Sequence, residues 1–156
     1  MVKSSFIRKS HNVTVLMYHL VCPAKYRRVV FSADVDDTLK KVCLDITDRY
    51  EIYFLEIGTD KDHVHFLIQS VPTLSPKDIV QTVKSITARE IFKRNPEVRK
   101  ELWGGALWSS GYFMTTVGQN AGEDVIAKYV KNQGNNDYQQ LYRSPMNPNQ
   151  MSLFMQ

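Results

Sequence analysis

Runs of apolar residues alternate with polar segments along the chain, and their spacing predicts strands and helices in turn. Asn12 to Val21 is rich in Val, Leu, Met and Tyr and predicts a strand buried on both faces. Ser32 can cap a helix that runs from about Ala33 to Tyr50. The apolar residues of this helix recur at spacings of three and four and define one face: Val35, Leu39, Val42, Cys43 and Ile46.

The next two apolar runs, Ile52 to Ile57 and His63 to Val71, are typical of strands. Residues 58–62 join them, which predicts a hairpin with a loop slightly longer than the tightest turns. A helix start follows at Ser75-Pro76-Lys77-Asp78, where a capping Ser precedes a Pro and an acid in the first turn. This helix extends to about Arg94, and its predicted inward residues are Ile79, Val83, Ile86 and Ile91.

Three more elements are expected in the last third of the chain. Pro96 to Leu102 is predicted as a short helix, and Ala106 to Val117 as a fourth strand. Asn120 and Glu123 match a capping box for a last helix that stops at Gly134. Residues 135–156 are rich in Asn, Gln and Pro and predict a mobile polar tail.

The predicted order is strand, helix, strand, strand, helix, strand, then an added helix. This is the split βαβ order of ferredoxin-like α+β domains. It predicts one antiparallel sheet with two helices on one face and the other face open, and in related RNA-recognition modules the open face meets nucleic acid. We expect a single domain over residues 1–134, a tail over 135–156, and no internal repeat.

Composition agrees with one globular domain. The chain has 156 residues, of which 43% are hydrophobic and 23% charged. It contains no run of about 18 uncharged apolar residues and no segment typical of an export signal. Cys22 and Cys43 lack a metal-type spacing and are expected to be reduced thiols. These features predict a cytoplasmic protein without a membrane partner.

Positive charge is concentrated near the N-terminus. Six basic residues precede the first acidic residue, Asp34: Lys3, Arg8, Lys9, Lys25, Arg27 and Arg28. The remaining residues carry 14 basic against 16 acidic groups, so the net charge of +4 comes from this first fifth. Such a patch attracts polyanions. An ordinary solvated surface with a frayed basic end would show the same pattern, so charge alone does not decide.

Two histidines lie two positions apart at the start of the third predicted strand. Because side chains alternate along a strand, His63 and His65 project from one face while Val64 points to the other. On the open face of the sheet they form half of a metal site. Two such histidines are also common as surface or hydrogen-bonded residues, and a metal site needs a third ligand from elsewhere.

The last predicted helix offers that ligand. Tyr129 and Gln133 are four positions apart and therefore share one helix face. A tyrosine beside an amide on a short helix is more often an interface residue. The combination of the histidine pair with Tyr129 and Gln133 is more specific than either half.

Four segments along the chain carry motifs that occur together in a known family. They are Tyr18-His19-Leu20-Val21 with Lys25-Tyr26-Arg27-Arg28, Thr59-Asp60-Lys61-Asp62-His63-Val64-His65, Leu107-Trp108-Ser109-Ser110 through Thr116-Val117-Gly118, and Tyr129-Val130-Lys131-Asn132-Gln133. In the same order, they resemble the motifs of single-tyrosine transposases of the HUH endonuclease superfamily, and the resemblance covers roughly residues 12–133. The family includes transposases of the smallest bacterial insertion sequences and relatives acting at repetitive extragenic palindromes.

The resemblance implies a DNA transposase that is a metal-dependent endonuclease and strand transferase. His63, His65 and Gln133 would bind Mg²⁺ or Mn²⁺, and Tyr129 would attack single-stranded DNA near a hairpin at the element's end. The product would be a 5′-phosphotyrosine link, formed without a nucleotide cofactor. The resemblance also implies a homodimer.

The same resemblance assigns DNA contacts to the basic residues. Lys25, Arg27 and Arg28 would grip phosphates and Tyr26 could stack on a base, while Arg8 and Lys9 add to the patch. Two more cations, Lys84 and Arg89 on the second helix, are weaker candidates and are expected to be solvated.

Three rival interpretations stay open. A replication initiator or relaxase of the same superfamily is disfavoured by the short chain without a helicase. A catalytically silent nucleic-acid-binding module would not need the histidine pair together with Tyr129 and Gln133. A two-histidine phosphodiesterase needs two separated His-x-Thr or His-x-Ser motifs, and the chain has a single histidine pair.

Overall fold

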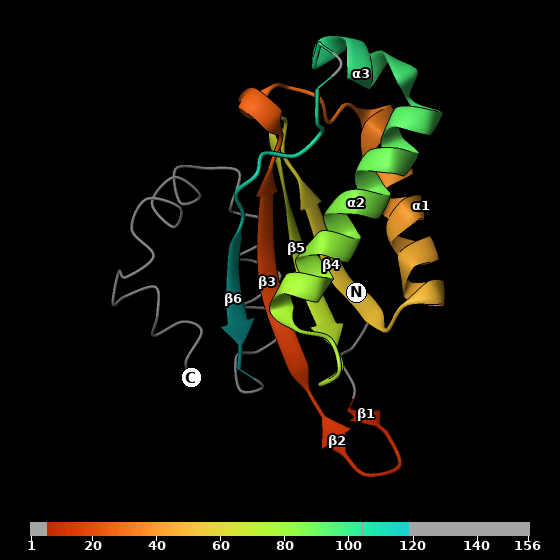
Figure 1. Ribbon diagram of the computed structural model, residues 1–156, viewed down its shortest axis with the longest axis vertical. Helices are drawn as coiled ribbons and strands as arrows, with labels where there is room; N and C mark the ends of the chain where they lie inside the picture. Colours follow the sequence, from red (N-terminus) through yellow and green to blue (C-terminus); the bar gives the residue numbers. More distant parts are fainter. Residues whose placement is uncertain (1–5, 104, 119–156) are drawn as a thin grey trace, which may run out of the picture.

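The computed structural model describes residues 6–103 and 105–118 (Figure 1). Its centre is a four-stranded antiparallel sheet in the order β4-β5-β3-β6. Two long helices, α1 and α2, cover one face of this sheet. The strands are β3 (Leu16–Pro23), β4 (Ile52–Thr59), β5 (His63–Ser70) and β6 (Phe113–Val117), and the helices are α1 (Ala33–Arg49), α2 (Pro76–Arg94) and α3 (Pro96–Glu101).

The chain order and the sheet order confirm the predicted ferredoxin-like α+β fold. β3 and β5 are the central strands, paired from Leu16↔Ser70 to Pro23↔His63. β4 forms a hairpin with β5, and β6 adds to the other edge of β3. β4 extends beyond the predicted end at Ile57 and reaches Thr59. Only a short turn at residues 60–62 therefore joins it to β5.

Both long helices begin where their caps predict. Ser32 Oγ accepts a hydrogen bond from the Val35 amide at 3.4 Å, and Ser75 forms a complete capping box with Asp78. The buried residues of α1 are the five that the spacing predicts, and Ile79, Val83, Ile86 and Ile91 of α2 are buried as predicted. These faces pack against the side chains of β3 and β5 that point toward the helices, so the main core lies between helices and sheet.

Two strand predictions were wrong in extent. The strand expected over residues 12–21 is split, because Val13–Thr14 (β2) leaves the main sheet and pairs with Ile7–Arg8 (β1) in a separate hairpin. The strand expected over residues 106–117 begins only at Phe113, and before it a single bridge joins Ala24 to Trp108. The predicted last helix and the tail lie outside the described residues.

The connection that precedes β6 is held by side chains of α2. Trp108 is buried, and its indole Nε1 donates to the Thr87 hydroxyl at 2.9 Å. The Lys84 ammonium donates to the backbone carbonyls of Ser109 and Gly111, both at 2.9 Å. These carbonyls bind a side chain instead of a neighbouring strand, which explains the late start of β6. Among the helices described, none is long and apolar enough to cross a membrane.

Candidate active site

The histidine pair lies on the sheet face turned away from the helices, as the alternation of strand residues predicts. In β5, Val64 packs in the main core between sheet and helices, so His63 and His65 point to the opposite face. Their ring centroids are 4.9 Å apart with the planes at 74°. This places two imidazoles side by side on a rigid central strand.

The expectation that this face is open was wrong at the histidines. His63 is 3% exposed and His65 is 2% exposed. A third histidine, His19 on β3, is fully buried beside them, with its ring 6.3 Å from that of His65 and nearly parallel to it. Burial lowers the pKa of His19 to about 3, so this imidazole is neutral at physiological pH.

His19 was not among the residues predicted for the site. It lies within the first resembling motif, but its place beside His65 follows from the strand register, in which His19 pairs with Leu67 and Val21 pairs with His65. The sequence contains one indication of this position. His19 is two residues from Val21, so the two side chains lie on the same face of β3.

Asp62 connects the histidine pair to the basic connection after β3. Its carboxylate lies 2.7 Å from Nδ1 of His63 and accepts a hydrogen bond from Nε of Arg27 at 2.9 Å. Partial burial opposes ionisation of Asp62, but the hydrogen bonds with His63 and Arg27 outweigh it and lower the pKa of this carboxyl. An ionised Asp62 holds the proton of His63 on Nδ1, which fixes the lone pair on Nε2.

The pair of imidazoles fits half of a divalent metal site. A carboxylate that orients a ligating histidine is the usual support of such a site. Within residues 6–103 and 105–118, no group of three His, Cys, Asp or Glu side chains is arranged to hold a metal ion. The predicted third ligand Gln133 and the predicted nucleophile Tyr129 lie outside the described residues and stay predictions.

The basic connection forms a short 3-10 turn, η1 (Lys25–Arg27), directly after β3. Tyr26 and Arg27 have positive φ angles of 59° and 53°, which non-glycine residues rarely adopt. The turn is fixed at both sides, since the Lys25 amide donates to the Leu107 carbonyl and the Ala24 amide donates to the Asp62 carbonyl, both at 2.8 Å. The basic turn is therefore anchored next to the start of β5, where the histidines lie.

The other predicted DNA contacts do not join this turn. Arg8 lies on β1, and Lys9 forms an ion pair with Glu51 just before β4. In Figure 1 the β1–β2 hairpin and the η1 turn lie at opposite ends of the sheet. The described basic residues of the N-terminal fifth are thus divided between two places.

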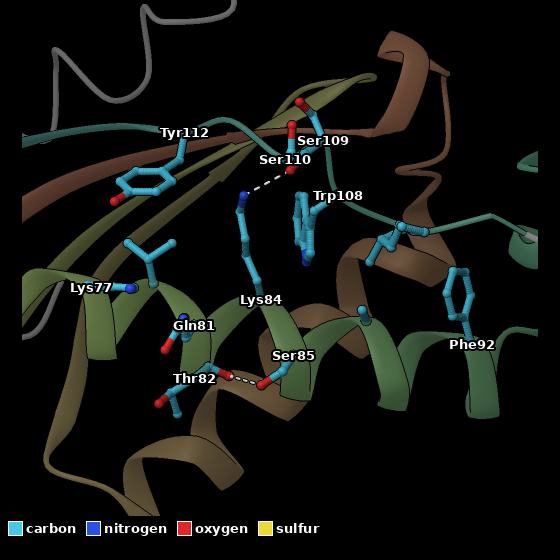
Figure 2. A pocket seen from close by; sticks show the side chains of 14 residues that line it. Lys77, Gln81, Thr82, Lys84, Ser85, Phe92, Trp108, Ser109, Ser110 and Tyr112 are labelled. Carbon is cyan, nitrogen blue, oxygen red and sulfur yellow. Dashed lines mark hydrogen bonds between the residues drawn. The ribbon is translucent and has the colours of Figure 1, made fainter.

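A hollow of about 790 Å³ lies between α2 and the connection to β6 (Figure 2). Apolar side chains such as Trp108 and Phe92 line it, and Lys84 reaches across it to the backbone of that connection. Lys84 was expected to be solvated, and this was wrong, because it binds two carbonyls and is partly buried. The hollow lies on the helix side of the sheet, away from the histidine pair.

Comparisons with known proteins agree on one family. Residues 12–133 match the family model described as "Transposase IS200 like". The chain is 35% identical to the ISDra2 transposase TnpA of Deinococcus radiodurans over 118 residues, which cover 76% of this chain and 84% of that protein. It is 27% identical over 120 residues to the transposase for insertion sequence element IS200 of Salmonella typhimurium, with 74% of this chain and 75% of the relative covered.

One solved structure extends this likeness to three dimensions. The crystal structure of a candidate transposase from Deinococcus radiodurans R1 superposes with a TM-score of 0.66 and 31% identity. The match covers 81% of this chain and 97% of the other. Sequence and fold therefore point to the same group of proteins.

Proposed function

The chain belongs to the family of IS200-like transposases, and we propose that it cleaves and rejoins single-stranded DNA with Tyr129 as the nucleophile. The observation that carries the proposal is the buried pair His63 and His65, in which Asp62 orients His63, at the end of the sheet where the basic turn η1 lies. A protein that only binds DNA has no need for an oriented imidazole pair.

A divalent ion, Mg²⁺ or Mn²⁺, would be held by His63, His65 and Gln133 and would supply positive charge against the scissile phosphate. All three ligands are neutral, so none of them reduces that charge. Among the described residues, Asp62 keeps His63 in the tautomer that leaves Nε2 for this role.

The covalent step exchanges one phosphodiester for another. The Tyr129 phenol oxygen attacks the phosphorus, a bond forms between them, and the bond from phosphorus to the 3′ oxygen breaks. The phenol loses its proton and the leaving 3′ oxygen gains one, which gives a 5′-phosphotyrosine link and a free 3′-OH. A 3′-OH can then attack the link in the reverse sense and seal a new junction, so no nucleotide cofactor is consumed.

The substrate proposed is single-stranded DNA that carries a hairpin near the cleavage point. Lys25 on the basic turn and Arg28 directly after it would bind its phosphates beside the histidine pair, while Arg27 is engaged with Asp62. We further propose that the protein works as a homodimer, as the family resemblance implies.

A covalent-adduct assay tests this function. Wild type, Tyr129→Phe and the matched control Tyr112→Phe are incubated with Mg²⁺ or Mn²⁺ and labelled hairpin DNA from the flanks of the gene, then run on a denaturing gel. We expect an adduct with wild type and Tyr112→Phe, and none with Tyr129→Phe or with chelator. An adduct that survives in Tyr129→Phe refutes the choice of nucleophile.

The same assay separates the rival function. If wild type shifts the hairpin in a native gel but forms no adduct on DNA that contains the cleavage site, the chain is a binding module and not a nuclease.

A further inference from the structure

An exposed aromatic cluster stands beside the basic turn, and Trp103 is its most exposed member. The side chain of Trp103, just after α3, is 75% exposed, and that of Tyr26 on η1 is 66% exposed. Their ring centroids are 6.3 Å apart with the planes at 42°. Two large aromatic rings from distant parts of the sequence are thus turned toward solvent at one place.

One cation lies near each ring of this cluster. The Arg28 guanidinium lies 4.1 Å from the centroid of the Trp103 ring, and Lys25 Nζ lies 5.2 Å from that of Tyr26. No carboxylate in the described part of the chain forms an ion pair with Lys25 or Arg28. The surface therefore combines π-faces with two cations that have no carboxylate partner among the described residues, which complements a polyanion that carries aromatic bases.

Unfavourable backbone conformations are concentrated at this cluster. Tyr26, Arg27 and Trp103 are the non-glycine residues with positive φ among those described, and all three lie in or beside this cluster. Strained residues of this kind gather where a local structure serves binding or catalysis. The turn at Trp103 also depends on Gly105, whose amide donates to the Leu102 carbonyl at 2.9 Å, and where a Cβ would come within 3.1 Å of that oxygen.

The cluster has a fixed position relative to the histidine pair. Pro23 of β3 pairs with His63 of β5, and Lys25 follows Pro23 by two residues. The Ser109 amide donates to the Pro23 carbonyl at 2.9 Å, which ties the chain after Trp103 to the same strand end. In Figure 1, η1 and α3 lie at the same end of the molecule.

From these observations we infer that Trp103, with Tyr26 and Arg28, is a stacking platform for an unpaired base of the single-stranded DNA. This inference rests on the proposed function for the identity of the ligand. Arg28 keeps the indole in place and contributes charge for the adjacent phosphate, while Trp103 supplies the π-face. The platform holds the strand that leads to the histidine pair and recognises a base by stacking, not by its hydrogen-bonding edge.

Intrinsic fluorescence tests the platform without any need for cleavage. The chain has two tryptophans, and Trp108 is buried, so Trp108→Phe makes Trp103 the reporter. If that variant does not fold, the difference in emission between wild type and Trp103→Phe gives the same signal. The probes are an oligothymidylate of about eight nucleotides and an abasic strand with the same number of phosphates.

We expect quenching of Trp103 emission by the oligothymidylate and little change with the abasic strand. Equal responses to both strands, or none, overturn the inference. A change in emission with protein concentration and no response to DNA would mean that a second copy covers Trp103, and this also overturns it.

Affinity provides the second readout. Trp103→Ala should weaken binding of hairpin DNA with an unpaired flank about 5- to 150-fold, without changing the salt dependence of binding. The matched control is Tyr50→Ala, since Tyr50 is another exposed aromatic ring, with the Arg49 guanidinium 5.6 Å from its centroid, in a different part of the molecule. Wild-type affinity in Trp103→Ala refutes the platform even if the Tyr129 adduct forms, whereas loss of the adduct alone refutes only the proposed nuclease.

Discussion

The Asp62 carboxylate lies 2.7 Å from Nδ1 of its neighbour His63, and the same carboxylate accepts a hydrogen bond from Nε of Arg27 at 2.9 Å. Adjacent strand residues normally point to opposite faces, but Asp62 stands in the turn just before β5, where its side chain can reach back to the ring. A buried imidazole is thereby oriented by a charge that is itself held by an arginine of the basic turn.

This relationship predicts that Asp62→Asn weakens metal binding. The amide keeps the shape of the carboxylate but loses the charge that favours the Nδ1 proton of His63. Loss of such a supporting group typically lowers metal affinity about 10- to 100-fold. Calorimetric titration of the full chain with Mn²⁺ measures the change.

Asp60→Asn is the matched control for that experiment. Asp60 stands in the same turn and its carboxylate accepts from the Lys61 amide, a bond that an asparagine can also accept. The affinity of the Asp60→Asn variant for Mn²⁺ should equal that of wild type. If Asp62→Asn also binds Mn²⁺ like wild type, His63 does not depend on this carboxylate.

A second prediction concerns the buried hydroxyl of Thr87. It accepts from Trp108 Nε1 at 2.9 Å and donates to the Val83 carbonyl at 2.6 Å. Thr87→Val should lower the free energy of unfolding by about 1–3 kcal/mol, because the buried indole N–H loses its acceptor. Urea unfolding measures the loss, and Thr87→Ser, which keeps the hydroxyl, should lose less. Equal losses in both variants would assign the effect to packing.

The capping box of α2 predicts a pH dependence. Hydrogen bonds from the backbone and side chain of Ser75 lower the pKa of Asp78 below its usual 3.8. Because the folded pKa is the lower one, ionised Asp78 stabilises the fold above about pH 4, and this contribution disappears as pH falls through the folded pKa. Asp78→Asn should therefore be less stable than wild type at neutral pH and similar to it in acid.

Asp48→Asn provides the control for Asp78, since it removes an exposed acid near the C-terminal end of α1, where negative charge is unfavourable. We expect no loss of stability from this change at neutral pH. Urea unfolding at neutral and acidic pH compares the variants, and a pH-independent difference for Asp78→Asn would contradict the assigned role of its charge.

The two thiols should be unreactive in the folded protein. Cys22 and Cys43 are free and buried, and burial raises the pKa of Cys22 to about 12 and that of Cys43 as well. Because the unfolded thiols ionise first, folding stability falls as pH rises above 9.0. Mass spectrometry after iodoacetamide should show slow alkylation in buffer and rapid alkylation in urea. Rapid labelling of the folded chain would show that these residues are not buried in solution.

The sequence predicted best where short-range patterns decide the structure. The caps at Ser32 and Ser75 start their helices, and the apolar spacing of α1 gives its buried face. The sequence predicted less of the structure where a contact between distant segments determines it. β6 begins late because Lys84, on another element, takes the carbonyls of Ser109 and Gly111.

In the candidate site, too, local patterns predicted some positions and distant contacts determine the others. Strand alternation placed His63 and His65 on one face, but it cannot report burial, which depends on all that packs there. His19 joins them through the register of β3 with β5, and Arg27 reaches Asp62 across 35 positions of sequence. Trp103 had no motif to mark it, since its role rests on exposure and on Arg28 from another segment.

The position of β3 at the centre of the sheet has a consequence for how fast the chain folds. The β4–β5 hairpin closes a short turn, whereas β3 meets β5 only across a separation of 40 to 54 residues and meets β6 across 92 to 100. Closing long loops costs chain entropy before any contact repays it, so such pairings slow folding. We expect the hairpin that carries His63 and His65 to form early, and the turn that brings Arg27 to Asp62 to become ordered only as β3 docks.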